Sequence, residues 1–138
     1  LESMRNRTNA YFTLDNLGYL VKSGRLSAPA GMIANLIGIK PLLQITQGQI
    51  VPVGRIRTLE RALETLVDSI FNFIGNQPYE IYAMVGAKAA INHTLFDIVR
   101  SKYGVEIRHS YPNTPAVGAH TGPDGIGLGV VLGHQVLA

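Results

Sequence analysis

The spacing of apolar residues changes along this chain, and that change constrains the fold more than any other feature of the sequence. At 79–85 and 105–109, apolar residues tend to occupy every second position, which is typical of strands. Between Leu59 and Ile74 they recur at every third or fourth position, which is typical of an amphipathic helix. A chain that moves between these two periods predicts a sheet with helices packed on it.

The expected elements follow from these periods and from the residues that cap helices or form turns. Thr13, Ser27 and Thr58 can each cap the start of a helix. The segment 46–49 contains a glycine between two apolar runs, which predicts the turn of a hairpin. The expected order is strand 10–13, helix 14–21, helix 27–38, hairpin 41–56, helix 59–74, strand 79–85, helix 92–103 and strands 105–109, 116–120 and 128–132. This order favours an α+β fold with a mixed, largely antiparallel sheet.

The composition indicates one compact domain over residues 1–138. Hydrophobic residues make up 46% of the chain and charged residues 15%, which argues against disorder. Cysteine is absent, so a disulfide scaffold and thiolate catalysis are excluded and structural zinc is not expected. No apolar run has the length of a membrane span, and residues 1–9 lack the apolar region of a signal peptide. We therefore expect a cytoplasmic protein with no integral membrane segment.

The charge of the chain is mildly basic. Lysine and arginine exceed aspartate and glutamate by 12 to 9, but the basic residues are scattered and aromatic residues make up only 7%. Nucleic-acid binding needs several cations on one face, preferably with stacking aromatic rings. The charge permits the binding of small anions, and we do not expect a nucleic-acid partner.

One expected helix carries no charge on any side. The segment 26–39 is uncharged, and Met32, Ile33, Leu36 and Ile37 are distributed around the helix. Such a helix is either buried in the core or faces an apolar ligand or partner. The sequence pattern alone leaves both interpretations open.

Two further segments could bind an anion. Residues 118–129 are rich in glycine and contain His120 and Thr121, so they form either an oxyanion site or a simple turn between strands. They match neither a dinucleotide fingerprint nor a Walker loop. Arg25 precedes a helix that Ser27 can cap, and this arrangement suits a carboxylate or a phosphate, although many such helix starts bind nothing.

Catalytic and metal-binding patterns are not found in the sequence. The histidines show no ligand spacing, so we expect no metal site. The chain also lacks the Gly-x-Ser-x-Gly elbow of a serine hydrolase.

Four segments, taken in order, resemble one family. These are 14–27 with Gly24-Arg25-Leu26-Ser27, 36–43 with Lys40-Pro41, 53–58, and 118–123 followed by Gly127-Leu128-Gly129. The family is the DegV family of fatty-acid-binding proteins, the lipid carriers of bacterial fatty acid kinase systems. The resemblance covers nearly the whole chain and corresponds to the C-terminal domain of the family. The N-terminal domain, whose Ser and Thr groups hold the carboxylate, is absent from this sequence, and we expect it to be a partner of this half.

The resemblance implies a carrier that presents a long-chain fatty acid to the catalytic subunit of a fatty acid kinase. The chain itself would then be no enzyme, have no catalytic residue and need no cofactor. The implied carboxylate-binding residues are Arg25, His120, Thr121 and Gly122. The implied acyl-chain pocket consists of Met32, Ile33, Leu36, Ile37, Ile39 and Leu42. Two alternatives are a phosphate-binding subunit of a small-molecule transferase and a basic module for binding nucleic acid or protein.

Overall fold

A computed structural model of the chain describes residues 7–14, 24, 39–46, 49–112 and 125–133. These residues form a sheet of six strands in the order β3-β2-β1-β6-β4-β5 with two helices. The elements are β1 (Thr8–Thr13), β2 (Lys40–Thr46), β3 (Gln49–Ile56), α4 (Leu59–Ile74), β4 (Tyr79–Val85), α5 (Ala89–Tyr103), β5 (His109–Pro112) and β6 (Ile126–Leu132). Among the described strands only β4 and β5 pair in parallel. The structure thus confirms the α+β fold and the mixed, largely antiparallel sheet.

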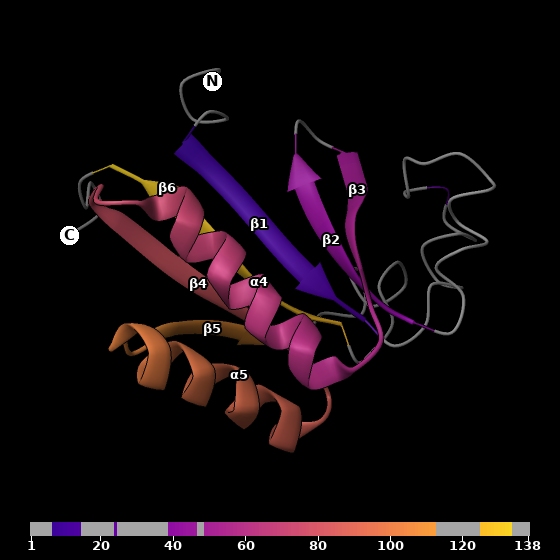
Figure 1. The fold of residues 1–138 in the computed structure, drawn as a ribbon. Helices are drawn as coiled ribbons and strands as arrows, with labels where there is room; N and C mark the ends of the chain where they lie inside the picture. The colour runs from indigo at the N-terminus through magenta and orange to yellow at the C-terminus, as the bar shows by residue number, and fades with distance from the viewer. Residues whose placement is uncertain (1–6, 15–23, 25–38, 47–48, 113–124, 134–138) are drawn as a thin grey trace.

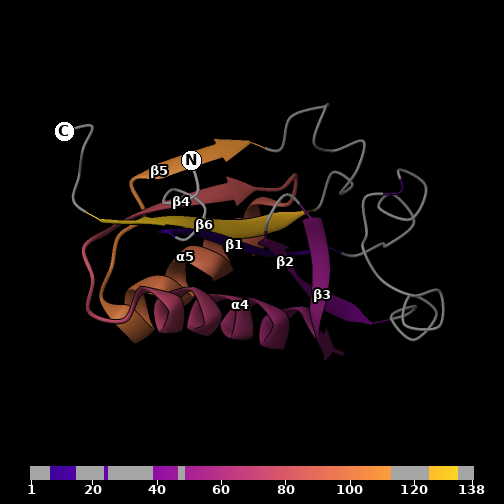
Figure 2. The same cartoon turned by 90° about the horizontal axis from the view of Figure 1, so that it is seen from above.

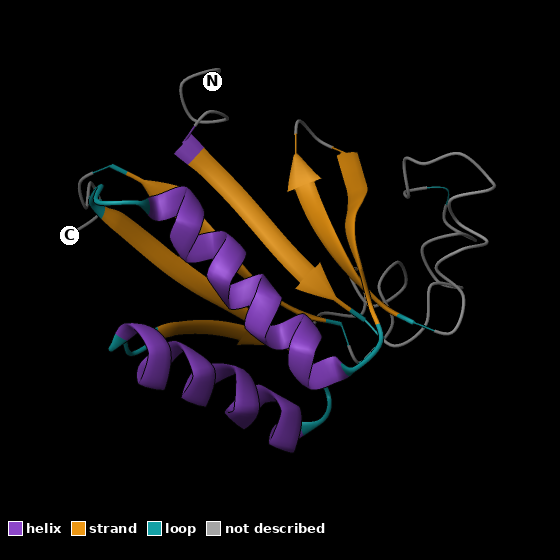
Figure 3. Ribbon diagram, in the orientation of Figure 1, coloured by secondary structure: helices purple, strands orange, loops and turns teal. Residues whose placement is uncertain are grey.

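Both helices pack on the same face of the sheet (Figures 1 and 2). The core lies between this face and the helices, and it consists of aliphatic side chains of β2, α4, β4, α5 and β6. Colouring by secondary structure shows one layer of strands and one layer of helices (Figure 3). We call the face that carries α4 and α5 the helix face, and the other the opposite face.

The long helix α4 forms as its sequence predicts. The Thr58 hydroxyl oxygen accepts a hydrogen bond of 3.3 Å from the backbone N–H of Arg61, which caps the helix. One side of the helix is fully buried against the sheet, and it consists of Ala62, Leu63, Leu66, Val67, Ile70 and Ile74. Leu59 and Phe73 of the expected apolar stripe are partly buried at its edge. No helix in the described part of the chain has the length and apolarity that a membrane crossing requires.

The predicted strand at 105–109 is wrong. Residues 104–108 have no regular structure, and the strand β5 begins only at His109. Val105 and Ile107 nevertheless pack against the core. The alternation of apolar residues at 105–109 therefore reflects an irregular connection that is buried on one side, not a strand.

The second helix begins at Ala89 rather than at Asn92. The Lys88 side chain does not cap it. Instead the Asn92 amide reaches back to the turn before the helix, accepting from the N–H and donating to the carbonyl of Gly86, both at 3.0 Å. The predicted elements at 14–21, 27–38 and 116–120 lie outside the described residues, apart from Leu14, which is buried.

The last described strand, β6, lies in the middle of the sheet between β1 and β4. Ile126, Leu128, Val130 and Leu132 are buried on the helix face. The glycines at 127 and 129 alternate with them and therefore belong to the opposite face. The position of β6 between β1 and β4 therefore places two glycines, Gly127 and Gly129, at the centre of the sheet.

Candidate functional site

Two rows of residues cross the opposite face of the sheet. Strand pairing aligns the first row as Ile45, Ala10, Gly129, Tyr82 and His109. It aligns the second row as Leu43, Phe12, Gly127, Met84 and Tyr111. In the first row the smallest residues, Ala10 and Gly129, lie on β1 and β6, and larger side chains stand on the strands to either side. In the second row only Gly127 on β6 is small. The result is a depression along the centre of the sheet.

This depression is an apolar hollow of about 240 Å³. It is lined by Ala10, Tyr11, Phe12, Ile45, Tyr82, Ala83, Met84, Tyr111, Gly127, Leu128 and Gly129, none of which is charged. Ile45 is 44% exposed and Tyr111 57% exposed, so large apolar side chains at its rim reach solvent. A hollow without a charged group in its lining suits an apolar ligand group rather than a charged one.

The Tyr82 hydroxyl at the hollow is already hydrogen-bonded within the protein. The Tyr82 hydroxyl donates a 2.5 Å hydrogen bond to Oε2 of Glu80. This bond, with burial and the carboxylate charge, raises the pKa of Tyr82. Its ring lies 5.3 Å from His109 and 6.4 Å from Tyr111, centroid to centroid. Tyr82 therefore keeps its proton and contributes an aromatic wall, and the described lining of the hollow contains no histidine or carboxylate.

A small buried group continues this face beyond the hollow. Phe12, Leu14 and Leu43 are at most 3% exposed, yet they do not belong to the core cluster under the helices. Phe12 is common to this group and to the hollow, because it pairs with Leu43 and also lines the depression. The second row, from Leu43 on β2 to Tyr111 on β5, thus contains no charged residue.

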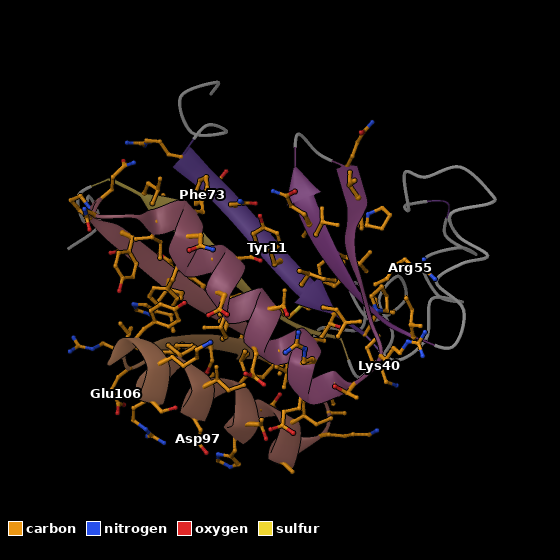
Figure 4. The ribbon with its side chains drawn as sticks, in the orientation of Figure 1. Tyr11, Lys40, Arg55, Phe73, Asp97 and Glu106 are labelled. Atoms are coloured by element: carbon orange, nitrogen blue, oxygen red, sulfur yellow. The ribbon has the colours of Figure 1, made fainter. Side chains whose placement is uncertain are left out.

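A second hollow has a different character. It measures about 760 Å³ and lies between β3 and the start of α4, and its lining combines apolar residues such as Leu42 and Val53 with the three arginines Arg55, Arg57 and Arg61. Within the described part of the chain none of these arginines forms an ion pair. Figure 4 shows Arg55 and Lys40 on this side of the molecule, whereas Asp97 and Glu106 lie on the α5 side. This hollow suits an anionic group rather than an apolar one.

Most of the residues expected from the sequence lie outside the described residues. These are Arg25, His120, Thr121 and Gly122 for the carboxylate, and Met32, Ile33, Leu36 and Ile37 for the acyl chain. Ile39 is half-buried just before β2. Leu42 is 3% exposed and belongs to the core on the helix face, so it does not line the apolar hollow. Among the described residues no group of three histidines or acids is placed to hold a metal ion.

The residues that line the hollow were not identified from the sequence. Ala10, Tyr82, Met84 and Gly129 come from three strands that are far apart in the chain. Their proximity depends on β6 lying between β1 and β4. One usable signal is the alternation of glycine with aliphatic residues at 126–130, because glycine is unfavourable inside strands and often marks a close approach.

Comparison with known families gives a clear result. A family model with the description "Uncharacterised protein, DegV family" matches residues 1–132. The chain belongs to the DegV family. A DegV domain-containing protein of Streptomyces coelicolor is 33% identical over 129 residues, covering 93% of this chain and 45% of that protein. A counterpart in Staphylococcus aureus is 29% identical over 133 residues, covering 95% and 46%. The chain therefore spans less than half the length of these DegV relatives.

Solved DegV structures share the fold. A fatty acid binding DegV family protein from Streptococcus agalactiae superimposes with a TM-score of 0.86 at 24% identity, covering 94% of this chain and 46% of that one. DegV from Bacillus subtilis, a fatty acid binding protein, gives 0.76 at 25% identity, covering 96% and 47%. A stearic acid-binding protein from Eubacterium ventriosum gives 0.83 at 21% identity, covering 95% and 46%.

Proposed function

We propose that this chain supplies the acyl-chain-binding part of a carrier that presents a long-chain fatty acid to a fatty acid kinase. The observation that carries the proposal is the apolar hollow on the opposite face, which has no charged residue in its lining. DegV proteins of the same fold bind fatty acids. The hollow offers what a fatty-acid tail requires, since each buried methylene contributes about 0.8 kcal/mol to binding.

The size of the hollow limits what it can hold alone. A volume of 240 Å³ has room for roughly eight groups of about 30 Å³, the volume of one water molecule in the liquid. A long-chain fatty acid extends beyond this. We assign the rest of the acyl chain to the uncharged segment with Met32, Ile33, Leu36 and Ile37, and to Ile39 beside β2.

The carboxylate end of the ligand requires hydrogen-bond donors, which the hollow lacks. Arg25, His120, Thr121 and Gly122 are the proposed donors in this chain. An arginine offers a bidentate fork, while a neutral histidine and a threonine hydroxyl donate without adding net charge. A second half, as in relatives of about twice this length, would complete the site.

The kinase is the proposed macromolecular partner. In this scheme the kinase phosphorylates the bound carboxylate, and the carrier contributes no catalytic residue and no cofactor. The hollow with Arg55, Arg57 and Arg61 supports contact with an anionic partner surface or a phosphoryl group. We place the carrier in the cytoplasm, where such a kinase has its ATP.

Native mass spectrometry of the complete protein tests the proposal. We expect a long-chain fatty acid to copurify, and Ile45→Asp to remove it by placing a charge at the rim of the hollow. Val53→Asp is the matched control for lipid retention, because Val53 is 46% exposed and Ile45 44%, and Val53 lines the arginine-containing hollow, to which we assign no part of the acyl chain. Absence of any lipid in the unmodified protein, or equal loss in both variants, would contradict the proposal. Salt-sensitive DNA binding without lipid would favour the nucleic-acid alternative.

A further inference from the structure

Two glycines of β6 lie on the same face of the sheet but meet different surroundings. A Cβ atom at Gly127 would lie 2.5 Å from both the Phe12 Cβ and the Tyr11 carbonyl oxygen, which is impossible without moving β1. A Cβ atom at Gly129 would meet the Ala10 Cβ at 3.8 Å and the Asn9 carbonyl oxygen at 3.9 Å, which are ordinary contacts. The sheet therefore requires glycine at 127 but not at 129.

We propose that Gly129 is a specificity-determining residue, whose missing side chain sets how much of an acyl chain the hollow accepts. The inference rests on the proposed function and deepens it. The ligand class is an unbranched long-chain fatty acid, whose tail lies over Gly129 and beside Ala10. A side chain at 129 would occupy the space that the tail fills.

The energetics of the strand support this assignment. Glycine in the interior of a strand is unfavourable, because it loses the most backbone entropy and offers no side chain to pack. At Gly127 the close approach of β1 explains the glycine. At Gly129 the described structure has room for a side chain, so packing of the sheet does not explain its absence.

The neighbours of Gly129 define the shape of the space. Its partners in the first row are Ala10 on β1 and Tyr82 on β4, and Ile45 stands beyond Ala10. Ala10 is also small, so Gly129 and Ala10 together leave a gap between Ile45 and Tyr82. The methyl group of Gly129→Ala would narrow this gap from the β6 side. Ala10→Gly would remove a methyl group from the β1 side and widen it again.

The experiment measures fatty-acid affinity in the complete protein with a series of saturated acids of graded length. Gly129→Ala should weaken binding of long acids about fourfold, the change that corresponds to one displaced methylene. Gly129→Val should weaken it ten- to a hundredfold, while acids too short to reach the hollow bind unchanged. The exchange Ala10→Gly with Gly129→Ala moves one methyl group across the gap and should restore most of the affinity.

Four results would overturn the inference. Wild-type affinity for every length in Gly129→Val would show that the tail does not pass position 129. Equal weakening for short and long acids would assign Gly129 to a general structural role, as would loss of cooperative unfolding in Gly129→Ala. If the unmodified protein binds no acid of any length, the proposed function fails as well, so the two failures are distinguishable.

Discussion

The two faces of the sheet come from the same strands but are built from different residues. On the helix face β6 contributes Ile126, Leu128 and Val130, each at most 2% exposed. On the opposite face the residues between them are Gly127 and Gly129, which line a hollow. Neither face of β6 carries a charged residue, so charge does not separate them. They differ in side-chain volume, which is large where β6 packs against the helices and absent where its glycines line the hollow.

This difference indicates that the two faces serve different purposes. A face that only stabilises the fold gains from large side chains, because buried area and close packing both increase stability. A hollow floored by glycine and alanine gives up that gain. We infer that changes on the helix face act mainly on stability, whereas changes at the hollow act mainly on binding.

The largest effect on stability is expected on the helix face. Leu66 of α4 is fully buried, and Leu66→Ala should lower the free energy of unfolding by about 2–5 kcal/mol through lost burial and a residual cavity. Urea denaturation measures this change. The control is Ile45→Ala on the opposite face, which should lower it by about 1 kcal/mol or less. Equal losses in the two variants would contradict the division between the faces.

The second prediction compares the two glycines by stability alone. Gly127→Ala should lower the free energy of unfolding by about 1–3 kcal/mol, because the new methyl group clashes with the β1 backbone. Gly129→Ala should leave it unchanged or raise it by about 0.5–1 kcal/mol, the intrinsic difference between the two residues. Thermal unfolding of both variants measures the contrast. A larger loss at 129 than at 127 would reverse the assignment of the hollow.

The smallest effect concerns pH and the attachment of α5 to α4. The Tyr103 hydroxyl donates a 2.6 Å hydrogen bond to Asp68, and this bond, with burial and the carboxylate charge, raises the pKa of Tyr103 to about 12. Because the unfolded chain loses this proton near pH 10, stability from the bond is present below pH 10 and is lost as pH rises towards 12. Both groups are more than a third exposed, so we expect about 0.5 kcal/mol or less.

Denaturation at several pH values tests this point. Tyr103→Phe should reduce the alkaline decline, leaving the part that comes from Tyr82, whose pKa is also raised, and should leave lipid binding unaltered, since Tyr103 lies on α5 and not at the hollow. An unchanged alkaline decline in Tyr103→Phe would assign the titration to another group.

The parts of the fold that depend on local pattern were predictable, and the parts that depend on strand order were not. The capping residue Thr58 and the apolar stripe from Leu59 to Ile74 predicted α4 correctly, because the buried positions of a helix recur every three or four residues in the sequence. The hairpin 41–56 and the strand 79–85 were likewise confirmed. The prediction for 105–109 failed because an irregular connection can also bury alternate residues.

The candidate site shows the same limit. The prediction that Leu42 contacts the acyl chain stays a prediction; an apolar residue in a strand fits either face, and pairing with β1 and β3 places Leu42 on the helix face, away from the apolar hollow. Gly129 and Ala10 are register partners at opposite ends of the chain. No local pattern contains that pairing, so the hollow becomes visible only once the sheet order is known.

The central claim is that the fatty-acid tail lies on the opposite face of the sheet, and methyl NMR of the complete protein tests it most directly. The chain has three methionines, and Met84 lines the hollow. With methionine methyl groups labelled, we expect bound fatty acid to give intermolecular NOEs between its methylenes and the Met84 methyl group, and Met84→Leu to identify that signal. A tightly bound fatty acid that leaves the Met84 signal unshifted and without such NOEs would contradict the account.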